Sequence, residues 1–139
     1  MRPLFEAYWK ITDRMESKMK DLGLNYGNPK VFLYLARKEG CKQADIARDC
    51  YIRSATLTTV LSNMEGRGLI KRERVPEDRR SYRIYLTEEG NRISQEIYRR
   101  IDITASEAYS GFSEKEIEEL RSYLNRISRN LEKNKDMNQ

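Results

Sequence analysis

Residues 68–90, with the sequence GLIKRERVPEDRRSYRIYLTEEG, decide the fold that we expect for the whole chain. Apolar residues stand on both sides of a polar turn at residues 76–78, and those after the turn recur at a spacing of two, which predicts β-strands. They are Leu69, Ile70 and Val75 before the turn and Tyr82, Ile84 and Leu86 after it. We therefore expect a β-hairpin with Arg79 and Arg80 near its tip.

This hairpin and the helix expected before it carry concentrated positive charge. Residues 53–83 hold eight Lys and Arg side chains against four Asp and Glu, so most of the net charge of +5 lies in this stretch. Basic side chains release condensed counterions from phosphates, so the region favours a polyanion, although a membrane surface would also attract it. The alternative is an ordinary surface hairpin with a solvated charge run. The neighbouring elements favour the first interpretation.

Two short helices are expected before the hairpin, at about residues 42–49 and 54–65, with the spacing of a helix-turn-helix. In the second helix, apolar residues follow i, i+3, i+4 and i+7, which predicts one buried face. These residues are Leu57, Val60, Leu61 and Met64. The other faces carry hydroxyl groups, which can bond base edges or phosphates, and threonine methyls, which can touch the thymine methyl.

Longer helices are expected on both sides of this region. Asn28 and Pro29 are typical of a helix start, and we expect that helix to end at Gly40. After the hairpin, Thr87 is expected to cap a further helix, and Ser113 with Glu116 forms a capping box for the last one.

The first and last helices each present an apolar row that a single small domain does not need. The row at residues 117–131 alternates steps of three and four, the period of a coiled-coil seam, so we expect a homodimer. Packing against the same domain is the alternative. The expected dimerisation residues are Leu4, Tyr8, Ile11, Ile117, Leu120, Leu124, Ile127 and Leu131.

The chain is thus expected to be a single domain over residues 1–139, mainly α with a small antiparallel β-wing. Its winged helix-turn-helix covers about residues 28–90, and its dimerisation helices cover about residues 1–22 and 91–132.

Two motifs in this framework resemble the MarR family of bacterial transcriptional regulators. The family's Asp-x-Arg, followed by Leu-Thr, appears as Asp78, Arg80, Leu86 and Thr87. Its Leu-Glu-x-x-Gly-Leu-Ile-x-Arg is matched at residues 64–72. Each pattern is short, but their order and spacing make the resemblance specific, and it covers residues 28–94.

The resemblance implies a homodimer whose terminal helices interlock, a recognition helix at residues 54–65, and Arg80 in the minor groove with Asp78 orienting it. Arg74 and Arg83 on the strands are expected to reach phosphates. A two-fold axis would place the recognition helices roughly 34 Å apart on a pseudo-palindromic operator in double-stranded DNA. The expected DNA-binding residues are Gln43, Arg53, Ser54, Thr56, Thr58, Thr59, Arg74, Asp78, Arg79, Arg80 and Arg83.

Three positions depart from the family pattern. Lys42 stands where the family often has a threonine cap. Arg53 stands at the usual Ser or Thr cap of the recognition helix, which leaves Ser54 as the alternative cap. Thr59 replaces a common arginine, so no guanidinium on this helix is available for bidentate reading of guanine, and the operator sequence stays open.

The family resemblance also implies a small-molecule pocket, for which aromatic or phenolic effectors suit the available side chains. The candidates are Tyr8, Trp9, Tyr26, Phe32 and Tyr34, and each of them is alternatively a plain core or surface residue. Cys41 and Cys50 offer thiol-based redox sensing as another mode of control, although neither lies in the first helix, where the redox-sensing branch of the family keeps its reactive cysteine.

Several function classes are disfavoured. The chain has no His and no Gly-rich phosphate loop, so we expect no enzyme, no metal and no cofactor. It shows no secretory signal and no apolar run that could span a bilayer, so we expect a cytoplasmic protein without a membrane partner. A dimeric repressor relieved by an effector is the leading hypothesis, and a winged-helix protein-interaction module without DNA binding is the alternative from a different class.

Overall fold

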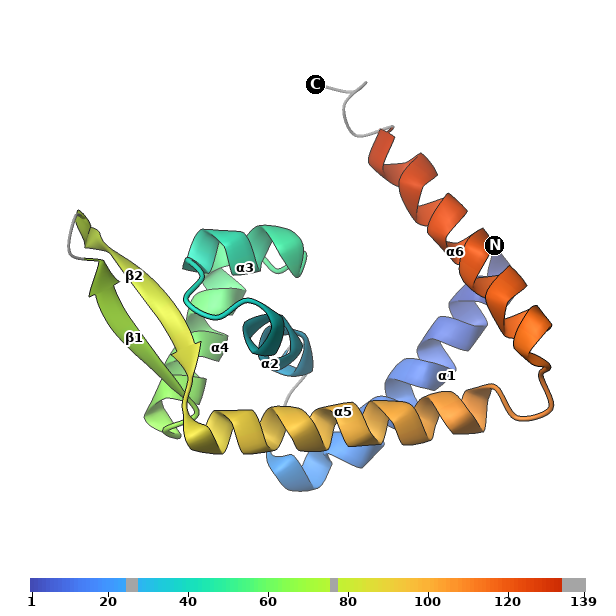
Figure 1. Ribbon diagram of the computed structural model, residues 1–139, viewed down its shortest axis with the longest axis horizontal. Coiled ribbons are helices and arrows are strands. Elements are labelled where there is room, and N and C mark those ends of the chain that lie inside the picture. Colours follow the sequence, from blue (N-terminus) through green and yellow to red (C-terminus); the bar gives the residue numbers. More distant parts are fainter. Residues whose placement is uncertain (25–27, 76–77, 134–139) are drawn as a thin grey trace. The chain divides into compact units, whose positions relative to one another are not determined.

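The computed structural model describes residues 1–24, 28–75 and 78–133, except for the side chains of residues 28, 78–81 and 133. The chain divides into two compact units, the first covering Met1–Thr104 and the second beginning at Ala105. Figure 1 shows helices as the dominant elements, with one two-stranded hairpin. The expected class, mainly α with a small antiparallel wing, is confirmed.

The elements follow one another in the expected order. They are α1 (Arg2–Met19), a 3-10 turn η1 (Lys20–Leu22), α2 (Asn28–Arg37), α3 (Gln43–Asp49), α4 (Ser54–Gly66), β1 (Ile70–Val75), β2 (Asp78–Leu86), α5 (Glu88–Ala108) and α6 (Glu114–Lys133). Among these helices, none has a stretch long and apolar enough to cross a membrane.

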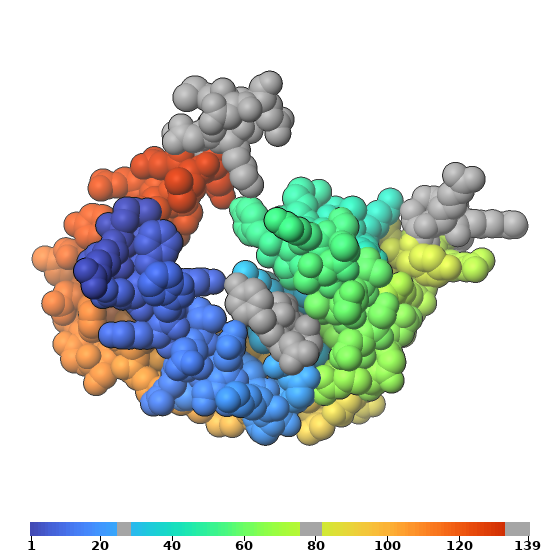
Figure 2. All heavy atoms as spheres, turned by 180° about the vertical axis from the view of Figure 1, so that it is seen from behind, coloured from blue at the N-terminus to red at the C-terminus, as the bar shows by residue number. Residues whose placement is uncertain are grey.

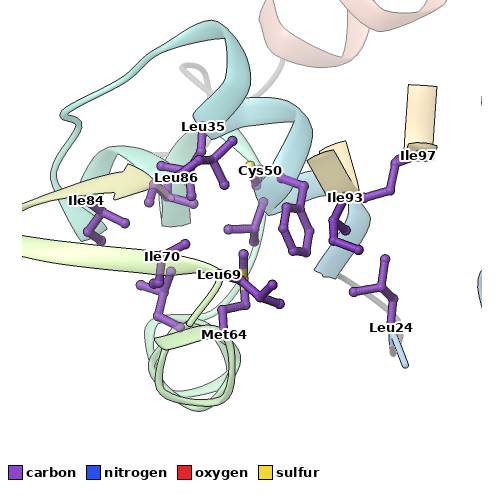
Figure 3. Close-up of a cluster of buried hydrophobic side chains, with 14 of the residues drawn as sticks. Leu24, Leu35, Cys50, Met64, Leu69, Ile70, Ile84, Leu86, Ile93 and Ile97 are labelled. Carbon is purple, nitrogen blue, oxygen red and sulfur yellow. The ribbon is translucent and has the colours of Figure 1, made fainter. Parts of the chain in front are cut away.

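The hydrophobic core of the first unit joins the helix-turn-helix to the base of the hairpin. Side chains from α2, α4, both strands and α5 meet in one cluster (Figure 3). The expected buried face of α4 is confirmed, because Leu57, Leu61 and Met64 are buried. Burying side chains of this size stabilises a fold by about 1.5–3 kcal/mol each, so the cluster fixes how these elements pack.

The hairpin is attached to the domain at its base. Its strands are antiparallel, with Ile70 opposite Leu86 and Arg72 opposite Ile84, and the register shifts between Arg74 and Val75. The backbone of Ile84 also pairs with the loop after α2: its N–H donates to the Cys41 carbonyl, and its carbonyl accepts from the Gly40 N–H. This third short segment anchors the wing beside α3.

One expected helix end and one expected cap are wrong, whereas the expected start of α4 at Ser54 is confirmed. Helix α2 ends at Arg37 rather than Gly40, because the Gly40 N–H bonds to β2 and Gly40 has φ +67, which a helix cannot continue. Helix α4 begins at Ser54 with Arg53 as its N-cap, and Arg53 makes no side-chain capping bond. Ser54 is therefore the first helical residue and does not replace the missing cap.

The two later caps are confirmed. The Thr87 hydroxyl accepts the Gly90 N–H at 3.1 Å and donates to the Gly68 carbonyl at 2.7 Å, so it starts α5 and binds that helix to the turn after α4. In the second unit, the Ser113 N–H donates to the Glu116 carboxylate at 2.8 Å, and the Ser113 hydroxyl accepts the Glu116 N–H at 3.3 Å. This is the reciprocal capping box.

Candidate nucleic-acid interface

Helix α4 presents a hydroxyl-rich face beside the hairpin. Ser54, Thr56, Thr58 and Thr59 are exposed, whereas the apolar row on the opposite side is buried. Figure 2 shows α3 in blue-green and α4 in green, forming one continuous body with the hairpin in yellow-green. A helix and a two-stranded wing are thus offered on the same compact unit.

Two hydroxyl groups of this face already donate hydrogen bonds to the backbone of α4. The Thr58 hydroxyl donates to the Ser54 carbonyl at 2.9 Å, and the Thr59 hydroxyl donates to the Ala55 carbonyl at 3.3 Å. Neither threonine therefore has a free hydroxyl donor, and each offers a methyl group and acceptor lone pairs, one of which Thr58 already uses for the Gln43 amide. Acceptor oxygens suit the amino groups of adenine and cytosine in the major groove, and methyl groups suit thymine.

Gln43 lies at the first position of α3 and reaches across the helix-turn-helix. Its amide nitrogen Nε2 donates to Thr58 Oγ1 at 2.7 Å. The bond joins residues 15 positions apart and is solvent-exposed. It therefore sets the approach of α3 to α4 at the surface, where the apolar core does not reach.

The wing arginines are partly engaged with the protein itself. Arg83 was expected to reach phosphates, but its Nη1 donates to the Gly40 carbonyl at 2.7 Å, so this side chain also fastens β2 to the loop before α3. The Arg74 guanidinium lies 5.8 Å from the centre of the Tyr82 ring, a cation–π contact on the wing.

Residues 78–80 belong to strand β2, but the side chains of Asp78, Arg79 and Arg80 lie outside the described part of the structure. The expected contact of Arg80 with the minor groove therefore stays a prediction. The same holds for the pairing of Asp78 with Arg80.

Arg72 connects the wing to the end of α4. Its Nε lies 3.3 Å from the Glu65 carboxylate, and its side chain is 25% exposed. Among the described residues, Nε and Nη2 of Arg72 are buried without a well-aligned hydrogen-bond acceptor, so the contact with Glu65 is an ion pair rather than a hydrogen bond. This pair nonetheless keeps strand β1 next to the recognition-type helix.

The aromatic residues expected in an effector pocket do not share one environment. Phe32 is fully buried in the core, whereas Tyr8 and Trp9 are exposed on α1, and Trp9 stacks on Phe5. Tyr26 lies outside the described residues. Tyr34 lines a surface depression beside the helix-turn-helix.

This depression has a volume of about 510 Å³ and is mixed in character. It is lined by Lys30, Leu33, Tyr34, Arg37, Lys38, Asp49, Cys50 and Tyr51. The Tyr34 hydroxyl donates to Asp49 at 2.8 Å, and burial followed by this bond raises the pKa of Tyr34 to about 12. Hydrogen bonds from Arg48 and Tyr34 lower the pKa of Asp49 to about 2. Asp49 is therefore ionised at neutral pH and already bound by its neighbours. Lys30 and Arg37 add positive charge to the lining of the depression.

The two cysteines lie in surroundings that suppress thiolate formation. Burial is the main cause that raises the pKa of both Cys41 and Cys50. Both are free thiols. Because the thiolate is the reactive form, this environment does not favour a redox sensor.

The sequence interpretation missed a pair of arginines that bind the segment following α1. Arg67, directly after α4, donates to the carbonyls of Leu22 and Gly23, and Arg100 of α5 bonds to Lys18 and Asp21. These contacts span 44 to 82 positions in the chain. No local pattern marks them, since each arginine has the spacing of an ordinary surface residue.

A three-helix core followed by a two-stranded wing, with α4 exposed along one side, defines a winged helix-turn-helix protein. Residues 30–82 match the model of the MarR family. The chain belongs to the MarR family.

A curated relative of this chain is named a transcriptional regulator. Transcriptional regulator HosA of Escherichia coli O111:H- is 33% identical over 93 residues, which span 67% of this chain and 65% of that protein. The chain thus aligns with just under two thirds of the length of this curated relative.

Solved structures show the same fold over nearly the whole chain. The transcriptional regulator SlyA superposes with a TM-score of 0.88 at 24% identity, covering 99% of this chain and 97% of SlyA. BpsR of Bordetella bronchiseptica, whose DNA binding is regulated by 6-hydroxynicotinic acid, superposes with a TM-score of 0.81 at 21% identity, covering 91% of this chain and 96% of BpsR.

Proposed function

We propose that this protein is a dimeric, sequence-specific DNA-binding transcriptional regulator that acts as a repressor on a pseudo-palindromic operator. The observation that carries the proposal is the exposed hydroxyl face of α4, held by the Gln43–Thr58 bond next to a basic wing. The family membership and the regulators among its relatives support the same function.

In this function, α4 enters the major groove and the wing follows the neighbouring minor groove. Ser54, Thr56, Thr58 and Thr59 meet base edges, while Arg53 at the N-cap and Arg74 on β1 meet phosphates. Gln43 acts through Thr58, and Arg83 divides its donors between Gly40 and the DNA backbone. Arg79 and Arg80 at the tip approach the narrow, negative minor groove, with Asp78 beside them.

Dimerisation is supported by apolar rows that stay exposed within each unit. In α1, Leu4, Tyr8 and Ile11 are exposed, and in α6, Leu124, Ile127 and Leu131 are 38%, 41% and 66% exposed. Ile117 and Leu120 continue the α6 row and are half-buried. The 3.5-residue period of the α6 row suits another helix, so a second copy of this chain is the proposed occupant.

The test begins with selection of bound sequences from a random duplex pool, which yields the half-site and its spacing. Wild type and Arg80→Ala are then compared on the selected duplex across a salt series. Loss of a phosphate or minor-groove contact is expected to weaken binding and to reduce the salt slope by about one. If wild type binds no duplex even at low salt, a winged-helix interaction module without DNA binding becomes the better description.

We further propose that a small aromatic or phenolic effector relieves repression by binding the depression lined by Tyr34. Its two tyrosines and the cations Lys30, Arg37 and Lys38 suit a flat ring with an acidic substituent. The regulation of BpsR by a hydroxylated aromatic acid supports this choice of ligand class.

An effector must prefer the form with low DNA affinity in order to release the operator. Hydroxylated aromatic acids are therefore to be titrated against the DNA complex, with Lys30→Met as the pocket variant. Release of wild type but not of Lys30→Met is the expected result. Equal release of both proteins would place the effector elsewhere.

A further inference from the structure

The segment that follows α1 ends a helical stretch, and the carbonyl groups at such ends lack partners within the helix. The 3-10 turn η1 closes at Gly23, which has φ +62, and the Gly23 N–H bonds back to Lys20. The carbonyls of Leu22 and Gly23 both accept hydrogen bonds from one side chain, that of Arg67.

Arg67 binds them in a two-pronged geometry. Its Nη1 donates to the Gly23 carbonyl and its Nη2 to the Leu22 carbonyl, each at 2.8 Å. A planar guanidinium that makes two such bonds fixes orientation as well as distance, which a lysine cannot do. Arg67 itself is the C-cap of α4, with its N–H bonded to Asn63 and Glu65.

The same segment is held from a second side by α5. Arg100, whose side chain is 14% exposed, donates to the Lys18 carbonyl and, with both terminal nitrogens, to the Asp21 carboxylate. Glu96, one turn earlier on α5, accepts from Arg100 Nε at 2.6 Å. Residues 18–23 are therefore fastened to α5 through Arg100 and to the end of α4 through Arg67.

We propose that Arg67 is a positioning residue for DNA binding, which sets the direction of α4 against the end of α1 without touching DNA. This inference rests on the proposed function. The inference deepens the proposed function, because α1 carries an expected dimerisation row. A shift of α1 at the dimer contact would be transmitted through residues 18–23 and Arg67 to the recognition helix. Arg100 binds the same residues 18–23 to α5.

The experiment compares wild type, Arg67→Met and Arg67→Lys as full-length chains. The matched control is Arg92→Met on α5. This substitution removes the same charge, and Arg92 pairs only with a residue of its own helix among the contacts described, Glu89 one turn away. Circular dichroism and thermal unfolding establish that each variant is folded at the assay temperature. Affinities are then measured on the selected duplex and on a random duplex, each across a salt series.

Arg67→Met is expected to lose about tenfold in affinity for the selected duplex, the size of a lost charge-assisted bond. Its affinity for random duplex and its salt slope should match those of Arg92→Met, because a misdirected helix loses base contacts and keeps phosphate attraction. Arg67→Lys keeps the charge but not the fork, so its affinity should lie between wild type and Arg67→Met.

Two results would overturn this inference while leaving the proposed function intact. Equal binding of wild type and Arg67→Met to the selected duplex would show that α4 needs no such support. A salt slope lower by about one in Arg67→Met than in Arg92→Met would make Arg67 a phosphate contact. Failure of wild type to bind any duplex would instead overturn the proposed function, so the two failures are distinguishable.

Discussion

Gln43 and Thr58 meet through a 2.7 Å hydrogen bond that joins the first residue of α3 to the exposed face of α4. The Thr58 hydroxyl, which accepts this bond, in turn donates to the Ser54 carbonyl in the first turn of α4. A residue of the supporting helix thus orders a side chain on the proposed reading face. Gln43 accordingly belongs to the proposed interface even if it touches no base.

Replacement of Gln43 by Ala is expected to reduce affinity for the selected duplex about threefold to tenfold, since one exposed hydrogen bond and the order of Thr58 are lost. A double-mutant cycle with Thr58→Val measures the coupling directly and should give about 1 kcal/mol. Additive effects of the two substitutions would contradict a working contact between these residues in the complex.

Gly90 is expected to be intolerant of any side chain. A Cβ at this position would lie 2.0 Å from the Leu69 carbonyl oxygen, where α5 packs against the turn before β1. Gly90→Ala should therefore lower the free energy of unfolding by more than about 2 kcal/mol, as forced overpacking does. Urea unfolding followed by circular dichroism measures the effect.

Gly66 provides the matched control, because it also lies in a helix but a Cβ there meets nothing within 4 Å. Gly66→Ala should leave stability unchanged or raise it by about 0.5–1 kcal/mol, since alanine restricts the unfolded chain. Equal effects of the two substitutions would refute the packing argument for Gly90.

The apolar row of α6 is expected to carry part of the dimer contact. Leu124→Glu places a charge in that row and should shift sedimentation at micromolar concentration toward the monomer. Ser122→Glu adds the same charge at an exposed position outside the row and should leave the wild-type species. Unchanged sedimentation of Leu124→Glu would remove this row from the interface.

Acid should weaken the connection between α5 and the segment after α1. Hydrogen bonds from Arg99 and then Arg100 lower the pKa of Glu96 from 4.5 to about 2, and the bond from Arg100 lowers the pKa of Asp21. Because both values are depressed in the folded state, the stabilisation is complete above the unfolded pKa values and is lost as the pH falls through the folded ones.

Unfolding midpoints in urea should therefore fall between about pH 5 and pH 2, and Glu96→Gln should show a smaller decline over that range. The variant begins from a lower stability at neutral pH, because the ion pairs of Glu96 with Arg99 and Arg100 are already gone, whereas the pair of Arg100 with Asp21 remains. A parallel decline in wild type and Glu96→Gln would show that other carboxylates dominate the acid response.

Much of this architecture follows from local signals in the sequence. The apolar spacing of residues 57–64 predicted the buried face of α4, and the alternation at residues 82–86 predicted β2. Thr87 and the pair Ser113 and Glu116 predicted two helix starts that the structure confirms. Such signals are legible because a cap or an amphipathic face depends on residues at most four positions apart.

Tertiary packing decided the rest. Helix α2 ends at Arg37 because the backbone near Gly40 pairs with Ile84, more than forty residues later. Arg83, expected on phosphates, also bonds to Gly40, and Arg67, which no sequence pattern marked, bonds to the turn after α1. Phe32, a candidate for both the effector pocket and the core, fills the core. A long side chain binds whichever carbonyl the folded chain brings within reach, and that proximity is created by the packing of the core rather than by neighbours in the sequence.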